Sequence, residues 1–287
     1  MSGDAAIRVS DLTKTYGDLH AVDGIDLTVE RGQCVALLGP NGAGKTTTTE
    51  ILEGYRQRDS GFVEVLGMDP AKAGRRWRSW IGIVLQSDGD LGELTVRESL
   101  RQFAGYYPNS RPVDEVLDQV GLVEKADARG RNLSGGQRRR LDVGLGIIGR
   151  PELLFLDEPT TGFDPEARRG FWALIESLKA EGTTILLTTH YLEEAEALAD
   201  MVGVITRGRM VAFDPPGVLG GRHTGVARVS WTEDSATRTE ETESPTSLIG
   251  ELATRLGGEV PNLTVTRPTL EDTYLSLVDD SRNEEQA

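Results

Sequence analysis

Cysteine is almost absent from this chain of 287 residues, which contains only Cys34. A single cysteine excludes a disulfide framework and a zinc site built from several cysteines, and it is typical of a protein from a reducing compartment. Basic residues are also few, with 31 Lys and Arg against 46 Asp and Glu, which gives a net charge of −15. Because Lys and Arg neutralise phosphate backbones, this balance disfavours a dedicated nucleic-acid-binding protein.

Long apolar runs are missing as well. The longest, such as Leu153–Leu156 and Ile185–Leu187, are far shorter than the roughly 20 residues of a transmembrane helix. The first 30 residues contain five aspartates and no continuous apolar segment, so we predict no secretory signal peptide. The chain is therefore expected to be cytoplasmic, and any contact with a membrane is expected to be peripheral and to depend on a partner.

Charge and turn-forming residues divide the chain into two parts. Residues 231–287 contain 13 acidic and 4 basic residues, and the turn Asp214-Pro215-Pro216 lies ahead of them. We predict a main domain over residues 5–215 and a small acidic α+β accessory domain over residues 216–287. In the accessory domain we expect strands at 226–231 and 262–266 and helices at 245–256 and 268–278.

In the main domain, short apolar segments alternate with helical patterns, which predicts an α/β fold. Most of the predicted strands are apolar throughout, which is typical of a core sheet covered on both faces. Residues 7–30 alternate more and predict an antiparallel β lobe ahead of the first core strand, and a helical subdomain is expected at about 87–131. The core strands are expected at 33–38, 81–85, 153–156, 184–188 and 202–205, and the helices at 45–53, 95–107, 112–120, 135–148, 165–180 and 191–199.

The strongest chemical signal directly follows the first core strand. It matches the phosphate-binding pattern G-x-x-x-x-G-K-[ST] without a gap and reads Gly39-Pro40-Asn41-Gly42-Ala43-Gly44-Lys45-Thr46. In such a loop, glycines let successive backbone N–H groups converge on an anion. Lys45 would reach the β- and γ-phosphates, and the Thr46 hydroxyl would bind Mg²⁺. The motif therefore predicts a P-loop nucleotide-binding domain rather than a glycine-rich turn without a ligand.

A pair of acids ends the strand predicted at 153–156. Because the carboxyl ends of parallel strands carry the ligand in such folds, Asp157 can hold Mg²⁺ directly or through water. Glu158 lies one residue further, where a general base could orient the attacking water. Paired acids at a strand end are otherwise often solvated turn residues, but the loop at Lys45 makes the nucleotide site the better interpretation.

The pentapeptide Leu133-Ser134-Gly135-Gly136-Gln137 opens an amphipathic helix twenty positions ahead of Asp157. With the loop at Lys45 and the Asp157-Glu158 strand in this order, residues 5–215 resemble the ATPase subunits of ATP-binding cassette (ABC) transporters. The N-terminus of the helix offers a second anion site at Ser134 and Gly136. Because the chain already has one phosphate cradle, this signature is expected to face the γ-phosphate bound by another subunit.

The resemblance implies roles for further positions. Tyr16 would stack on adenine, Gln86 would ligate Mg²⁺ and sense the membrane subunit, and His190 would contact the γ-phosphate. Asp164 would reach across the dimer, and Phe163, where Leu is usual, indicates a changed packing at the subunit contact. Catalytic roles are expected for Glu158, His190, Lys45 and Gln86; Mg²⁺ ligation for Thr46, Gln86 and Asp157; and ATP contacts for Tyr16, Gly39–Thr47, Gln86, Ser134–Gln137 and Asp164.

Residues 132–169, 189–219 and 269–275 are most similar to the drug-exporter branch of the family, the daunorubicin-resistance type. This implies a homodimer, or a dimer with a similar ATPase, that uses ATP and Mg²⁺ to power transmembrane permease subunits. The exported compounds would be drugs, lipids or other amphiphiles, and no nucleic acid would be bound. Tyr106, Tyr107 or their neighbours are predicted to touch a cytoplasmic loop of the permease. A soluble ATPase of cofactor assembly and a nucleotide-gated regulatory protein remain as alternatives.

Two further features of the sequence are predicted to have structural rather than functional roles. Arg138-Arg139-Arg140 follows the signature and is predicted to be a helix surface. Cys34 lies in an apolar strand and is predicted to be an inert core residue.

Overall fold

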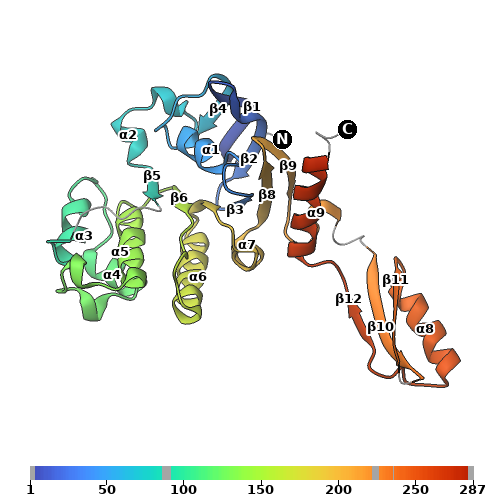
Figure 1. The fold of residues 1–287 in the computed structure, drawn as a ribbon. Coiled ribbons are helices and arrows are strands. Elements are labelled where there is room, and N and C mark those ends of the chain that lie inside the picture. The colour runs from blue at the N-terminus through green and yellow to red at the C-terminus, as the bar shows by residue number, and fades with distance from the viewer. Residues whose placement is uncertain (1–3, 86–91, 222–225, 235, 284–287) are drawn as a thin grey trace. The chain divides into compact units, whose positions relative to one another are not determined.

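The computed structural model describes residues 4–85, 92–221, 226–234 and 236–283. The chain separates into two compact units, Met1–Val211 and Ala212–Ala287. Figure 1 shows the elements of both in chain order. Each unit is described by itself below.

Two sheets form the N-terminal unit. An antiparallel sheet has the order β2-β1-β4, with β1 at Ala5–Tyr16, β2 at Leu19–Glu30 and β4 at Ser60–Val65. The core sheet has the order β5-β6-β7-β3-β8-β9, and β3 and β6 pair in parallel with their neighbours on both sides. This mixed α/β architecture confirms the predicted fold class. Its strands are β3 (Cys34–Leu38), β5 (Ile81–Val84), β6 (Leu153–Asp157), β7 (Thr184–Thr188), β8 (Met201–Thr206) and β9 (Arg209–Asp214).

Central strands of the core sheet are buried along their whole length. Every residue of β3 and of β7 is buried, because both strands are flanked by strands on either edge and by helices over the faces. Cys34 lies in β3 with no exposed surface, and burial raises the pKa of its thiol to about 12. The thiol therefore stays protonated and unreactive at neutral pH, as expected of a core cysteine.

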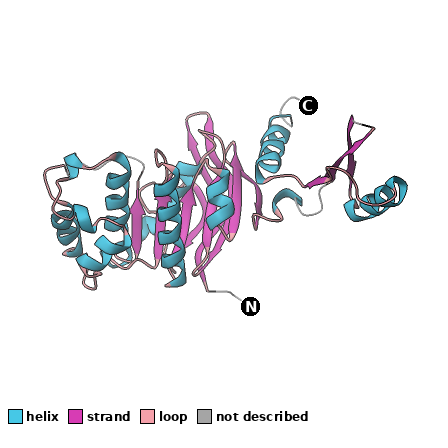
Figure 2. Ribbon diagram, turned by 90° about the horizontal axis from the view of Figure 1, so that it is seen from below, coloured by secondary structure: helices cyan, strands magenta, loops and turns pink. Residues whose placement is uncertain are grey.

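Helices of the N-terminal unit begin at recognisable caps. Thr95 and Glu98 form a capping box at the start of α3, and Asp164 caps α6, which begins with Pro165. Helices α3, α4 and α5 pack on one another, whereas α6 and α7 lie side by side along the core sheet (Figure 2). The helices are α1 (Lys45–Leu52), α2 (Arg75–Arg78), α3 (Val96–Ala104), α4 (Val113–Gln119), α5 (Gly135–Ile147), α6 (Pro165–Ala180) and α7 (Leu192–Leu198).

The C-terminal unit is a small antiparallel sheet of order β11-β10-β12 with helix α8 packed on it. Its core consists of Val229, Trp231, Leu252 and Val260. Sequence patterning did not predict β11, which is polar and exposed along nearly all of its length. The elements are β10 (Ala227–Glu233), β11 (Ala236–Thr242), α8 (Pro245–Leu256), β12 (Thr264–Thr266) and α9 (Leu270–Asn283).

Neither unit contains, in its described residues, a helix with the length and apolar character needed to cross a lipid bilayer.

Candidate nucleotide-binding site

The loop between β3 and α1 has a backbone that only glycine permits at two positions. Gly39 has φ 155°, and a Cβ there would lie 2.1 Å from the Ile205 carbonyl oxygen. Gly44 has φ 107°, and a Cβ there would lie 2.2 Å from the Ala21 carbonyl oxygen. Gly44 is also the N-cap of α1 and supplies no side-chain cap. The first N–H groups of α1 are therefore available to an anion, in keeping with the motif.

Lys45 turns back over this loop. Its ammonium group donates hydrogen bonds to the carbonyl oxygens of Gly39 at 2.6 Å and Pro40 at 3.1 Å, and the residue is buried. Burial lowers the pKa of Lys45, against the opposing effect of the Glu158 and Asp157 charges. A buried ammonium held only by neutral carbonyls and two nearby acids is well suited to gain a phosphate as its partner.

The four consecutive threonines at the start of α1 fall into two pairs that differ in hydrogen bonding and burial. The hydroxyls of Thr48 and Thr49 donate to the carbonyl oxygens of Gly44 and Lys45, one turn earlier, and both residues are buried. Such bonds satisfy hydroxyls that would otherwise be buried without partners. Thr46 is exposed and Thr47 is half-buried. The Thr46 hydroxyl is therefore accessible to a ligand, and it shares a pocket with Asp157.

Asp157 is the last residue of β6, and Glu158 follows it in a different backbone conformation. An Asp157 carboxylate oxygen accepts a hydrogen bond from the Thr188 hydroxyl at the end of neighbouring β7. Glu158 has φ 45°, in the left-handed region that costs a residue other than glycine about 1–3 kcal/mol. Its backbone N–H donates to the Thr188 carbonyl at 3.0 Å, and its carboxylate accepts from the Thr161 hydroxyl at 3.3 Å.

His190 lies beside Glu158, as expected for two residues of one site. Its Nδ1 is 3.4 Å from a carboxylate oxygen of Glu158, and 46% of its side chain is exposed. The imidazole ring packs on Tyr191, with the ring centroids 4.1 Å apart, and the Arg168 guanidinium lies 4.7 Å from the centroid of Tyr191. This stack joins His190 to helix α6. Gln86, the other residue predicted to act here, lies outside the described residues.

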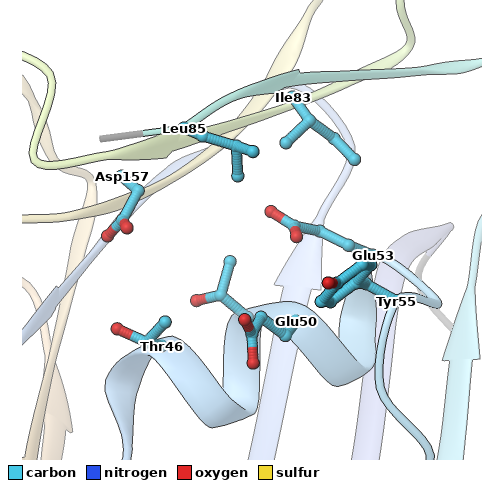
Figure 3. A pocket seen from close by; sticks show the side chains of 8 residues that line it. Thr46, Glu50, Glu53, Tyr55, Ile83, Leu85 and Asp157 are labelled. Carbon is cyan, nitrogen blue, oxygen red and sulfur yellow. The ribbon is translucent and has the colours of Figure 1, made fainter. Parts of the chain in front are cut away.

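A pocket of about 660 Å³ adjoins the N-terminus of α1 (Figure 3). Thr46 and Asp157 lie at one end of it, and Ile83 and Leu85 face Glu53 and Tyr55 across it. Thr49 and Glu50 also line this pocket. Sequence patterning missed its apolar wall, because exposed apolar residues at the end of a core strand look the same in sequence as buried ones.

Glu53 is an unexpected titratable residue in the lining of this pocket. It is 9% exposed, and burial, followed by the charges of Asp157 and Glu50, raises the pKa of its carboxyl to about 8. The carboxyl is therefore mostly protonated at neutral pH. No sequence signal marked Glu53, since an acid at the end of a short helix is ordinarily solvated.

Tyr16 ends β1 and is 40% exposed. The Lys14 ammonium and the Arg56 guanidinium each lie 5.4 Å from the centroid of its ring. Arg56 in turn forms an ion pair with Glu50, one of the residues that line the pocket. The ring is thus partly open to a planar ligand and partly covered by cations.

The signature residues form the start of α5. Ser134 is its N-cap: the Ser134 hydroxyl accepts from the Gln137 N–H at 3.2 Å, and the Gln137 side chain accepts from the Ser134 N–H at 3.0 Å. Ser134 and Gly135 are exposed, and Gly136 and Gln137 are half-buried. None of residues 134–137 is among the described residues that line the pocket beside α1. In the part of the chain that the structure describes, the starts of α1 and α5 therefore do not line this pocket together.

Asp164 and Phe163 have partners inside their own chain. The Asp164 carboxylate accepts from the Ala167 N–H at 2.8 Å as the cap of α6, yet the residue remains exposed. Phe163 is only 7% exposed and packs edge to face on Phe171, with the ring centroids 6.1 Å apart. The Phe163 ring thus packs in the interior of its own chain, and the prediction that it changes the packing at a subunit contact stays a prediction.

Arg139 corrects the prediction that all three arginines after the signature lie on the helix surface. It is 9% exposed, and its guanidinium donates to the backbone carbonyl oxygens of Pro159 at 3.1 Å, Leu85 and Asp157. Its neighbours Arg138 and Arg140 are half-buried. In a helix, one residue of three consecutive ones can face the core while the others do not, and composition alone does not tell which.

Comparisons with known proteins identify the family of this chain. Residues 22–161 match the family described as "ABC transporter". The chain is 46% identical over 219 residues to a Nod factor export ATP-binding protein I from Rhizobium meliloti, over 75% of this chain and 65% of that protein. The corresponding protein of Paraburkholderia xenovorans (strain LB400) is 42% identical over 221 residues, which cover 75% of this chain and 73% of that protein. The match thus spans just under two thirds of the first of these relatives.

Among solved structures, the ATP binding subunit of an ABC transporter superimposes with a TM-score of 0.68 at 28% identity, over 74% of this chain and 90% of that one. The chain therefore belongs to the ABC transporter family, and its fold is that of the family's ATPase cassette. This confirms the family predicted from residues 39–46, 133–137 and 157–158.

Proposed function

We propose that this chain is the ATP-hydrolysing subunit of an ABC exporter. The observation that carries the proposal is the meeting of the Lys45 loop, Asp157 and the Glu158–His190 pair around the start of one helix. Export is supported by the relatives, which are named as Nod factor export proteins. The similarity of residues 132–169, 189–219 and 269–275 to the drug-exporter branch favours drugs, lipids or other amphiphiles as the exported compounds.

The chain's own residues fit ATP and Mg²⁺. The uncapped N–H groups of α1 and the buried Lys45 ammonium suit the β- and γ-phosphates, and the half-open ring of Tyr16 suits adenine. The accessible hydroxyl of Thr46 and the carboxylate of Asp157, with Gln86, are oxygen donors of the kind Mg²⁺ prefers. When bound, Mg²⁺ would supply charge neutralisation at the phosphates.

Hydrolysis by this site needs positioning more than covalent chemistry. Glu158 would orient water and accept its proton, since its carboxylate is within 3.4 Å of His190 and is only 16% exposed. His190, with its exposed ring, would contact the γ-phosphate. Lys45 would exchange its carbonyl partners for phosphate oxygens and stabilise their charge.

A second copy, or a similar ATPase, would complete each site. The start of α5 at Ser134 is exposed and does not line the pocket beside α1. The N–H groups of Gly135 and Gly136, which the capping box does not use, could therefore meet a phosphate carried by another subunit. Residues Ser134–Gln137 and the exposed Asp164 would then face the partner's ATP. Because such an ATP contacts both subunits, ATP binding favours the closed dimer. Hydrolysis of that ATP then lets the two subunits separate.

The membrane subunit would dock near the pocket beside α1. Tyr55 is 80% exposed and Leu85 is 53% exposed, and an exposed apolar patch with a polar rim is typical of an interaction site. Glu50 lines the same pocket as Ile83 and Leu85, so a permease segment with apolar side chains and a basic one would fit it. Tyr106, which is 66% exposed, offers a second contact on the helical layer, as the sequence predicted. Crosslinking from Tyr55 and Tyr106 in cells to a permease would support this docking, and its failure at both positions would count against it.

Glu158→Gln tests the proposed function. We expect steady-state ATP turnover to fall by at least about 100-fold, with Mg-ATP affinity unchanged, because only the base is lost. Light scattering should show the variant shifting from monomer to dimer with Mg-ATP, and Ser134→Arg should abolish that shift. The exposed Glu176→Gln on α6 is the matched control and should leave turnover unchanged. Wild-type turnover by Glu158→Gln, or no turnover by the wild type, would overturn the proposal.

A further inference from the structure

Arg139 makes contacts that join three separate segments of the N-terminal unit. It lies in the second turn of α5, the helix that begins at Ser134. Its guanidinium donates to the carbonyl oxygens of Leu85 at the end of β5, of Asp157 at the end of β6, and of Pro159 just beyond. The side chain is buried, so these bonds are shielded from water and from competing anions.

Two of these acceptors flank Glu158. The carbonyl oxygen of Asp157 precedes the residue and that of Pro159 follows it, so both ends of the segment are bonded to one guanidinium. Between them Glu158 adopts its left-handed backbone with φ 45°. A non-glycine residue persists in this region only where the surroundings fix it. Two further described backbone bonds restrain this segment. The Glu158 N–H donates to the Thr188 carbonyl at 3.0 Å, and the Thr161 N–H donates to the Glu158 carbonyl at 3.3 Å.

We propose that Arg139 is a positioning residue that holds Glu158 in this strained conformation and aims its carboxylate at the attacking water. The inference rests on the proposed function, in which Glu158 is the base. Three of the five N–H donors of Arg139 are bonded to these carbonyl oxygens, so the proposed role needs no contact with nucleotide. It acts on hydrolysis only through the backbone that carries Glu158.

Arginine suits this role for a geometric reason. Its planar fork presents five N–H donors in fixed directions, so a single side chain can serve acceptors on different segments. A lysine carries the same charge, but its ammonium is a compact point that cannot span the same acceptors. Arg139→Lys would therefore keep the charge and lose part of the restraint.

The contact with Leu85 extends the same restraint to another functional segment. Leu85 lines the pocket beside α1 and directly precedes Gln86 in the sequence. Through Arg139, the helix that carries the signature is bonded both to this segment and to the strand end that carries the base. A displacement of α5 therefore acts on Glu158 directly.

The test compares Arg139→Lys and Arg139→Gln with Arg140→Gln, which removes the same charge from the same helix at a half-buried position. The full-length proteins are assayed for kcat and KM of ATP hydrolysis, for Mg-ATP affinity by titration calorimetry, and for thermal stability. We expect Arg139→Gln to lower kcat on the order of 100-fold, the effect of displacing a catalytic group by about 1 Å, with KM and affinity unchanged. Arg139→Lys should be intermediate and Arg140→Gln close to wild type.

The number of nucleotide-binding sites measured by calorimetry distinguishes a positioning role of Arg139 from a role in folding. If Arg139→Gln merely unfolds part of the protein, the number of binding sites falls while kcat per binding site stays at the wild-type value, and the inference is overturned. It is also overturned if both Arg139 variants hydrolyse ATP like the wild type. Failure of the proposed function is distinguishable, because the wild-type protein itself would then not hydrolyse ATP.

Discussion

The two units of this protein bury different kinds of residue. The N-terminal unit buries Lys45, Arg139 and Glu194 together with its apolar core, and burial raises the pKa of the Glu194 carboxyl. In the C-terminal unit, the buried residues that the structure describes are almost all apolar, and strand β11 is exposed along nearly its whole length. A buried charge is costly unless neighbouring groups compensate for it. Buried charged residues are therefore often found at functional sites.

Left-handed backbone occurs in both units, but in different places. In the N-terminal unit, Glu158 is left-handed at the end of a core strand, and Gly39 and Gly44 allow approaches that no side chain would permit. In the C-terminal unit, the left-handed Gly257 ends α8, an ordinary helix terminus with open space around it. The left-handed residues Asp234 and Asn262 of this unit lie in turns. The comparison teaches that the N-terminal unit places a left-handed residue and two closely packed glycines at its candidate site, whereas the left-handed residues named in the C-terminal unit lie in turns or at a helix end.

Gly44→Ala should break the N-terminal site most severely among changes outside the catalytic residues. Its Cβ would lie 2.2 Å from the Ala21 carbonyl at a φ of 107°, so the loop must move. We expect Mg-ATP binding, measured by calorimetry, to be lost. Gly170→Ala is the control, because Gly170 lies exposed in α6 with open space around its Cα and should tolerate alanine with a gain of up to about 1 kcal/mol. Normal nucleotide binding by Gly44→Ala would contradict the rigid-loop account.

Two buried tryptophans allow the units to be destabilised separately. Trp231 is 5% exposed in the C-terminal core, and Trp77 is 1% exposed in the N-terminal unit, where its indole donates to the Val65 carbonyl. Each change to alanine should cost about 3–5 kcal/mol in the unit that contains it. Hydrogen exchange read by mass spectrometry should show faster exchange over residues 227–266 in Trp231→Ala and over β1 and β4 in Trp77→Ala. Faster exchange in both units for either variant would mean that they unfold together.

Glu53 should make the N-terminal unit sensitive to pH. Its folded-state pKa of about 8 lies above the ordinary 4.5, so its contribution to stability is fully present below about pH 4.5 and is lost as the pH rises through about 8. Glu53→Gln cannot ionise and should melt at a higher temperature than the wild type at pH 8.5, with little difference at pH 5. The matched control Glu50→Gln, at a less buried carboxylate, should not show this pattern. Parallel melting curves for Glu53→Gln and wild type across this range would refute the assignment.

Thr239→Ala should have the smallest effect of all. Thr239 lies in β11, is exposed, and exchanges one hydrogen bond of 3.1 Å with Ser230 on the neighbouring strand. Surface substitutions of this kind change stability by no more than about 0.5 kcal/mol. Denaturant unfolding monitored at Trp231 gives the value. A loss as large as that of Trp231→Ala would show that the exposed face of this sheet is structural after all.

Much of the N-terminal unit could be predicted, because its signals are local. The strand at residues 34–38, the glycine-rich loop and the helix beginning at Lys45 follow one another without interruption, and period and spacing identify each. Strand β11 could not be predicted, since its polar residues owe their extended form to pairing with β10 rather than to a pattern of their own. The apolar wall of the pocket and the burial of Glu53 were missed for a related reason: exposure is a property of neighbours distant in sequence.

The sequence by itself determined the family and the glycine-rich loop, and it singled out the residues proposed to carry the chemistry, because these depend on residue type and spacing along the chain. Only the tertiary structure decided that Arg139 faces inward while its neighbours do not, that Glu158 has a left-handed backbone, and that His190 lies beside it. The physical reason is that burial, strain and hydrogen-bond partners are set by segments brought together from β5, β6, β7 and α5, and no local pattern records that meeting.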